Sequence, residues 1–182
     1  LAFDIHVQPD FPTYSMRNIT KNDIDYLKQY DLAVKYIGET NVEGGKYETS
    51  VMLSIFGKES QEAAVPLNNN IISLDGSFIG ELKFYGQGAG GDPTANAVVQ
   101  DIIDCADAPI EGQQNFSANL SYNPELFVSD YVFRTQADIP GGSFWEPGAQ
   151  LVKNLSAEKA RELLTRALTQ DPTTFMAALE KR

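Results

Sequence analysis

The stretch FYGQGAGGDPTANAVVQDIID, residues 84–104, decides how the middle of this chain folds. A strand that ends at Tyr85 is expected to run into a glycine-rich turn over residues 86–91 and then into a helix. Asp92 is predicted to be the N-cap, and Pro93 suits the first helical position because its missing N–H is not needed there. Apolar residues recur behind it at helical spacing and predict a buried helix face: Ala95, Val98, Val99, Ile102 and Ile103.

Two interpretations of the glycine turn follow from its residues. The spacing GxGAGG differs from the GxGxxG pattern that binds dinucleotides. Strand, glycine turn and helix start nevertheless create a place where backbone can approach a ligand closely. The alternative is a tight connection whose glycines only permit positive φ angles.

The sequence on either side predicts an α+β fold, with a mostly antiparallel sheet and helices on one face. Thr20 is expected to cap a helix over residues 21–30, followed by a strand over 32–37. A hairpin turn is expected at 41–45, before an alternating strand over 47–56. A second hairpin is predicted over 71–85, with a type I′ turn at Asp75-Gly76.

We expect three segments in the domain organisation: residues 1–106, a linker over 107–127 that is rich in Asp, Gly, Gln, Asn and Ser, and a small α+β region over 128–182. That last region is predicted to hold a β-hairpin and two helices. Ser156 would cap the first helix, and Asp171-Pro172 would start the second, with Phe175, Met176, Ala178 and Leu179 along it.

Composition excludes several functions. The 14 basic and 25 acidic residues give a net charge of −11, and the basic residues are scattered, which argues against nucleic-acid binding. His6 is the only histidine, so no metal site is expected. No run approaches the roughly 20 apolar residues of a membrane helix, so no membrane association is expected. The single cysteine, Cys105, fits the reducing cytoplasm and is interpreted as a small buried residue.

The sequence of the glycine turn and the helix after it resembles the GAG..PTA..VV.D segment of homoserine dehydrogenases. Gly88-Ala89-Gly90 leads to Pro93-Thr94-Ala95, and Val98-Val99 and Asp101 follow. Upstream segments are also similar to the family: residues 18–27, the run Leu32-Ala33-Val34-Lys35-Tyr36-Ile37-Gly38, and residues 64–72. Tyr36 and the Asn69-Asn70-Ile71 run depart from the family pattern. The resemblance covers about the first 106 residues.

The resemblance implies a substrate-binding and dimerisation domain of an enzyme that interconverts aspartate semialdehyde and homoserine with NADP or NAD. It implies that Gly88, Ala89, Gly90 and Thr94 lie at the cofactor, bound mainly by another domain. Lys35 matches a family lysine and could lie near the small-molecule substrate. The alternative is that its stem packs while its ammonium reaches water. A homodimer built on residues 46–85 is also expected.

No catalytic residues are expected in this chain. The family's catalytic motif, E.DP..D..G.D...K, would lie upstream of Leu1, so we expect a piece of a larger enzyme that is inactive alone. A different hypothesis is a non-catalytic binding or regulatory module related to that domain.

The last region carries a second resemblance. Tyr131, Arg134, Asp138, Pro140 and Gly141 are similar to the opening of a ligand-sensing regulatory domain found at the end of several homoserine dehydrogenases. A reduced form of that domain is one interpretation of residues 128–182. The other is a hairpin and two helices that pack on the main domain or on a second subunit.

Overall fold

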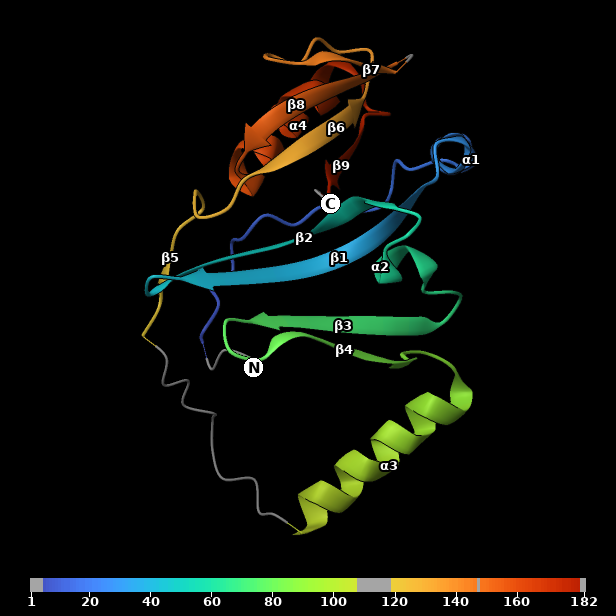
Figure 1. The fold of residues 1–182 in the computed structure, drawn as a ribbon, viewed down its shortest axis with the longest axis vertical. Helices are drawn as coiled ribbons and strands as arrows, with labels where there is room; N and C mark the ends of the chain where they lie inside the picture. The colour runs from blue at the N-terminus through green and yellow to red at the C-terminus, as the bar shows by residue number, and fades with distance from the viewer. Residues whose placement is uncertain (1–4, 108–118, 147, 181–182) are drawn as a thin grey trace. The chain divides into compact units, whose positions relative to one another are not determined.

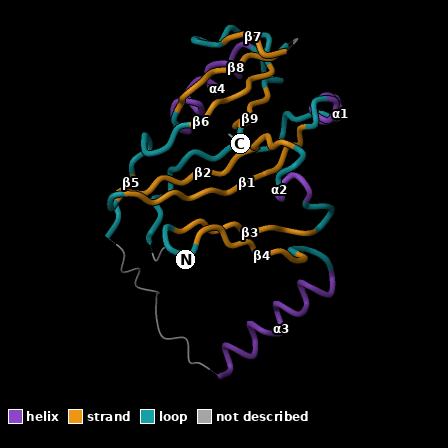
Figure 2. The backbone as a smooth tube through the Cα atoms, in the orientation of Figure 1, coloured by secondary structure: helices purple, strands orange, loops and turns teal. Residues whose placement is uncertain are grey.

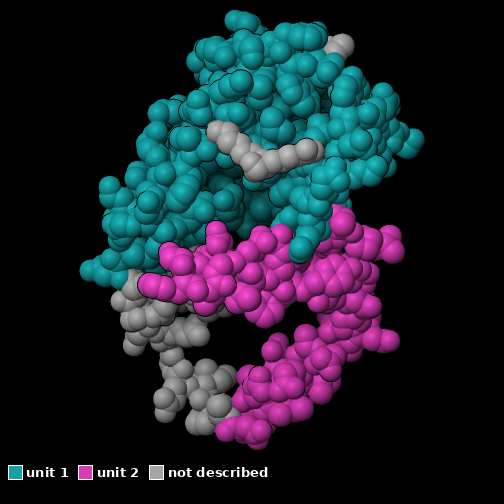
Figure 3. All heavy atoms as spheres, in the orientation of Figure 1, with its two compact units in different colours: residues 1–63, 116–182 teal, residues 64–115 magenta. Residues whose placement is uncertain are grey.

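A computed structural model describes residues 5–107, 119–146 and 148–180 (Figure 1). The chain forms two compact units, which are coloured separately in Figure 3. Unit 1 consists of residues 1–63 and 116–182, and unit 2 consists of residues 64–115. The units divide the chain differently from the segments expected from sequence, because the C-terminal strands join the sheet that begins near the N-terminus.

Unit 1 is built on a seven-stranded sheet (Figure 2). Its main path runs β1-β2-β9-β6-β8-β7, and β5 also pairs with β2. The pairings are antiparallel except that β5 and β9 run parallel to β2. The strands are β1 Leu32–Glu43, β2 Lys46–Gly57, β5 Ser121–Tyr122, β6 Ser129–Arg134, β7 Ser143–Glu146, β8 Ala149–Leu155 and β9 Phe175–Leu179. The expected α+β class with a mostly antiparallel sheet is therefore confirmed.

Both faces of the central strands β2, β6 and β9 are buried, because successive strand residues point to opposite sides. On one face, Tyr131 and Phe133 pack with the apolar side of α4 (Ala157–Gln170). On the other face, Val132 packs with Leu27 of α1 (Lys21–Gln29). The two helices thus cover opposite faces, whereas the sequence analysis expected helices on one face. A strand such as YVF, which is apolar at consecutive positions, needs cover on both sides.

The local signals of unit 1 form as predicted. Thr20 caps α1 through a capping box in which its hydroxyl accepts from the Asp23 N–H at 3.2 Å. The turn between β1 and β2 is Gly44-Gly45, and both residues have positive φ, as a two-residue hairpin turn requires. Ser156 caps α4. Both strands of the hairpin are longer than expected.

The expected final helix is wrong: Phe175–Leu179 forms strand β9, which lies between β2 and β6. The run FMAAL is short and apolar throughout, and such a run fits a buried strand as well as a helix. Residues 108–118 of the expected linker lie outside the described part of the chain. Within the rest of that linker, Ser121–Tyr122 forms strand β5.

Unit 2 contains the hairpin of β3 (Asn69–Gly76) and β4 (Gly80–Gln87), followed by α3 (Gly91–Asp107). The hairpin is confirmed, but its turn is not at Asp75-Gly76. Gly76 pairs with Gly80 around a three-residue loop, and Gly80 takes the positive φ of +67°. A short helix, α2 (Gln61–Ala64), precedes the hairpin.

Helix α3 differs from the expectation in two ways. It begins at Gly91, so Asp92 is in the first turn and is not the N-cap. Its apolar residues are exposed, at 51% for Val98 and 64% for Ile102, whereas the sequence analysis predicted a buried face. Cys105 is exposed as well. The helical period correctly identifies an apolar face, but periodicity does not say what covers it.

Candidate functional site

The glycine turn between β4 and α3 is fixed by the segment that precedes β3. The Gly88 N–H donates to the Asn68 carbonyl at 2.9 Å, and the Asn68 side-chain amide donates to the Ala89 carbonyl at 2.6 Å. These two bonds hold the expected cofactor residues Gly88 and Ala89 against the start of the hairpin. The turn is therefore a defined structure within unit 2.

Two positions of the turn favour glycine, each for a different physical reason. A Cβ on Gly88 would lie 1.8 Å from the Asn70 side-chain nitrogen, so any larger residue must displace that side chain. Gly90 has φ of +122°, which residues with a side chain rarely adopt. By contrast, a Cβ on Gly86 would meet open space, and the φ of Gly86 is not positive.

The turn exposes backbone that a ligand could reach. Ala89, Gly90 and Thr94 are all exposed, and no other described residue bonds to the Thr94 hydroxyl. At the helix start, however, Asp92 adds negative charge, and Pro93 has no N–H to donate. The site suits neutral polar groups such as sugar hydroxyls or an amide better than a phosphate.

Lys35, the expected substrate residue, lies on β1 opposite Ser54 and is half-buried. It belongs to unit 1, whereas the glycine turn belongs to unit 2.

A polar groove on the unit 1 sheet was missed by the sequence analysis. The pairs Glu39–Ser50 and Asn41–Glu48 place four polar side chains on one face of β1 and β2, and the Lys35–Ser54 pair shares that face. The groove has a cavity of about 30 Å³ and is also lined by Phe127, Ser129 and Tyr131. That volume is far below the roughly 150 Å³ of an engineered cavity that holds benzene, so the polar groove has room for water-sized molecules.

The groove changes the acidity of its carboxyl groups. Burial, together with the neighbouring Glu39 carboxylate, raises the pKa of Glu48 to about 7, although a backbone hydrogen bond from Phe127 opposes the shift. Burial and the same Glu39 also raise the pKa of Glu180. Glu48 is only 5% exposed. Alternating polar residues on both strands of the predicted hairpin were the sequence signal that could have revealed this face.

Two negative findings apply to the residues that the structure describes. No group of three or more His, Cys, Asp or Glu side chains among them could hold a metal ion. In the same residues, no helix is both long and apolar enough to cross a membrane.

Comparison with known proteins gives a consistent picture. A family model described as "Homoserine dehydrogenase" matches residues 1–103. The homoserine dehydrogenase of Bacillus subtilis is 34% identical over 104 residues, which are 57% of this chain and 24% of that protein. The one from Pseudomonas aeruginosa is 28% identical over 154 residues, covering 78% of this chain and 36% of that protein. This chain thus spans about a quarter to a third of these relatives.

Solved structures share the fold. A homoserine dehydrogenase from Thiobacillus denitrificans superposes with a TM-score of 0.65 at 20% identity, over 93% of this chain and 48% of that one. A homoserine dehydrogenase from S. aureus gives a TM-score of 0.50 at 23% identity, over 88% of this chain and 44% of that one. At these identities the likeness establishes the fold alone.

Proposed function

Because this chain belongs to the homoserine dehydrogenase family, we propose that it is the substrate-binding and dimerisation part of an enzyme that interconverts aspartate semialdehyde and homoserine. The observation that carries the proposal is the exposed glycine turn, which lies inside the matched residues 1–103. NAD or NADP would supply the hydride acceptor or donor when bound. In this proposal residues 1–106 are the family domain, and residues 128–182 are an appended region, such as a reduced regulatory domain.

In the proposed enzyme, the backbone of Gly88, Ala89 and Gly90 lies against the ribose or nicotinamide end of the cofactor. A neutral end is favoured because Asp92 and Pro93 weaken the helix start as a phosphate site. Thr94 holds the first turn through its N–H, which donates to the Gly90 carbonyl at 3.1 Å, and its exposed hydroxyl is available to the ligand. Lys35 is proposed to lie near the substrate.

Activity is the first test. The purified chain should not turn over homoserine with either NAD or NADP, because we place the catalytic carboxylates and lysine in a segment upstream of Leu1. A protein that includes that segment and a nucleotide-binding domain should be active. Turnover by the chain alone would contradict the assignment of roles, and an inactive longer protein would favour a non-catalytic module.

The glycine turn is tested in the complete enzyme with Gly90→Val and the matched control Gly86→Val. The Gly90 change should raise the Michaelis constant for the cofactor or lower turnover, since its Cβ blocks the backbone and its φ favours glycine. The Gly86 control adds the same side chain where space is open. Circular dichroism would check folding. Normal kinetics in a folded Gly90→Val enzyme would show that the turn is only a connection.

We also propose a homodimer, with a contact surface smaller than the expected range of residues 46–85. That range covers β2, which is buried in unit 1, and the hairpin of unit 2. Cross-strand register places the apolar residues Ile72 and Phe84 on one face of the hairpin, at 61% and 58% exposure. We assign the subunit contact to that face, because large exposed apolar patches mark interaction sites.

Sedimentation across micromolar concentrations tests the dimer. Phe84→Lys should shift the mass toward one chain, whereas Tyr85→Lys should not, because Tyr85 points to the opposite face at a similar exposure of 60%. A wild-type mass of one chain throughout, or equal effects of both variants, would reject this face.

We propose the cytoplasm as the place of action. The single cysteine, Cys105, is a free and exposed thiol, and such thiols persist in reducing compartments. Fractionation of cells with an antibody to the natural protein would check it, and recovery in an extracytoplasmic fraction would reject the proposal.

A further inference from the structure

A second cavity in unit 1 is separate from both features described above. Its volume is about 250 Å³, which exceeds that of an engineered cavity of about 150 Å³ known to hold benzene. It is lined by Tyr14, Ser15, Arg17, Asn18, Leu168, Pro172 and Phe175. It therefore has room for a small organic molecule, unlike the polar groove on the unit 1 sheet.

The walls of this cavity are held in place by the fold. The Tyr14 N–H donates to the Val51 carbonyl at 2.7 Å, which fixes the loop to the edge of β2. The Asn18 side-chain amide donates to the Pro172 and Thr174 carbonyls at 2.9 and 2.8 Å. The loop and the start of β9 thus form one connected wall.

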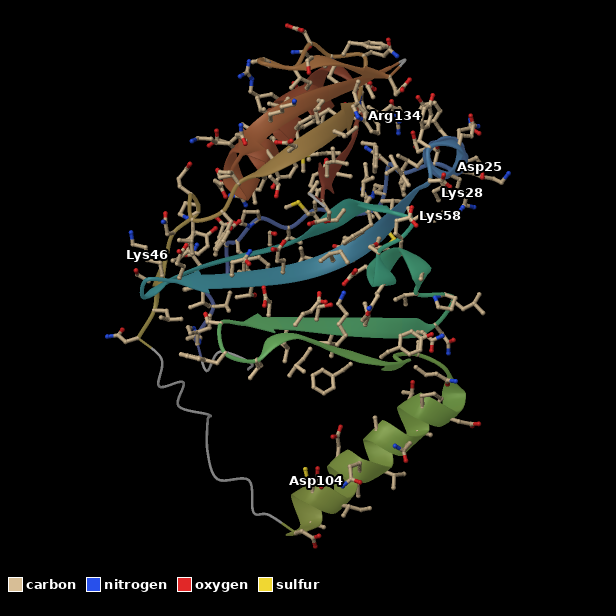
Figure 4. All side chains as sticks on the ribbon, viewed as in Figure 1. Asp25, Lys28, Lys46, Lys58, Asp104 and Arg134 are labelled. Atoms are coloured by element: carbon tan, nitrogen blue, oxygen red, sulfur yellow. The ribbon has the colours of Figure 1, made fainter. Side chains whose placement is uncertain are left out.

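Arg134, which lies at the end of β6 and is labelled in Figure 4, binds the same loop without lining the cavity. Its guanidinium forms a salt bridge with Asp23 at 2.7 Å and donates to the Asn18 carbonyl at 2.8 Å. It also lies 5.8 Å from the centre of the Phe175 ring. Because the Arg134 guanidinium is already paired with Asp23, the cation that can pair with a ligand in the cavity is the lining residue Arg17.

The lining combines one cation with an apolar surface. Within the described residues, the Arg17 guanidinium makes no ion pair or hydrogen bond, although the chain carries a net charge of −11. Leu168, Pro172 and Phe175 supply the apolar side. The Tyr14 and Ser15 hydroxyls can add hydrogen bonds.

We infer that this cavity binds a small carboxylate with an apolar body, paired through its carboxylate to Arg17. A guanidinium presents a planar fork that matches a carboxylate, and the apolar body would be removed from water against Leu168 and Phe175. The inference concerns unit 1 alone and does not depend on the proposed catalytic role.

Isothermal titration of the purified full chain with phenylacetate tests this site. Binding is expected in roughly the millimolar range, as a ligand of this size allows. Arg17→Gln should weaken it by about tenfold or more, because it removes a charge-assisted pair. The matched control Arg166→Gln removes an exposed arginine of α4 that does not line the cavity, and it should bind like the wild type.

Two further probes separate the parts of the inference. The neutral isostere phenylacetamide should bind more weakly than phenylacetate, and inorganic phosphate should too, since it lacks the apolar body. The site is overturned if phenylacetate does not bind at all, or if Arg17→Gln, with an unchanged thermal transition, binds it as the wild type does. Phosphate that binds as tightly as phenylacetate would overturn the apolar part of the inference.

Discussion

The two compact units differ in how far their apolar side chains are buried. In unit 1 the central strands β2, β6 and β9 are buried on both faces, and Phe133 and Ile55 are fully buried. In unit 2 the hairpin and α3 leave large apolar side chains in contact with solvent, including Phe78, Phe84 and Ile102. Helix α3 has no buried residue among those described.

This contrast shows where stability resides within the chain. Unit 1 removes apolar area from water with its own sheet and two helices, which is the main driving force for folding. A two-stranded hairpin with exposed apolar faces gains little from its own contacts. We therefore expect unit 1 to determine the stability of the chain, and unit 2 to be the part that is stabilised by a partner.

The largest expected effect is a direct test of that contrast. Phe133→Ala should lower the free energy of unfolding by about 4 kcal/mol, since it removes a fully buried ring and leaves a cavity. Phe84→Ala should change the free energy by about 0.5 kcal/mol or less, because its ring is 58% exposed. Urea unfolding of both variants measures the difference. Similar losses would show that unit 2 has a core of its own.

A second prediction concerns pH and unit 1 alone. The pKa of Glu48 is about 7 in the folded chain against 4.5 ordinarily, so the folded state holds its proton more tightly. The stabilisation of the folded state by Glu48 is complete below pH 4.5 and is lost as the pH rises to about 7. The loss amounts to about 3 kcal/mol. Urea unfolding at several pH values between 4.5 and 8 gives the slope of the unfolding free energy against pH.

Glu48→Gln should remove most of this slope, because glutamine stays neutral. A smaller slope should remain from Glu180, whose pKa is also raised. Glu162→Gln is the matched control, because Glu162 is exposed on α4. If Glu48→Gln keeps the wild-type slope, Glu48 is not the group that titrates.

A third prediction tests how unit 1 joins its helix to its sheet. Arg134→Ala should cost about 2 kcal/mol, since it leaves Asp23, 11% exposed, without its cation and breaks bonds to Asn18 and Thr173. Lys58→Ala breaks the Lys58–Asp31 pair, which is exposed at 71% and 65%, and should cost about 0.5 kcal/mol or less. Thermal unfolding compares them. Equal losses would mean that Arg134 is only a surface charge.

The smallest effect is expected in the glycine turn of unit 2. Gly88→Ala should destabilise the turn by about 1 kcal/mol, because its Cβ must displace the Asn70 side chain. Asn70→Ala in the same chain should recover most of that loss. Hydrogen exchange of the Gly88 N–H, which bonds to Asn68, reports on this turn locally. Additive effects of the two changes would reject the steric account.

Sequence alone predicted the elements that depend on neighbouring residues. The N-cap at Thr20 and the hairpin turn expected at 41–45 are local signals: the cap forms, with Asp23 completing a capping box, and the turn forms at Gly44-Gly45. Strand β9 was missed because its identity depends on Ser54 and Tyr131, which lie far away in the chain and pair with Ala178. A short apolar run carries no information about such partners.

The candidate sites divide in the same way. The glycine turn is a contiguous motif, so its residues could be named in advance, although the roles of Asn68 and Asn70 could not. The raised pKa of Glu48 depends on its burial and on Glu39, which the register of β1 and β2 places on the same face, and sequence alone does not show either. The Arg17 cavity likewise joins a loop near residue 17 to residues 168–175.

The position of β9 has a consequence for the growing chain on the ribosome. The β1–β2 hairpin is made before β9, and the end of β2 at Ser54 and Ile55 gains its parallel neighbour only after residues 175–179 have been made. Until then this end of the β2 edge presents unpaired backbone groups, which can pair with strand edges of other chains. Unit 1 is therefore expected to complete its fold late, and chaperones that shield strand edges should matter most during that interval.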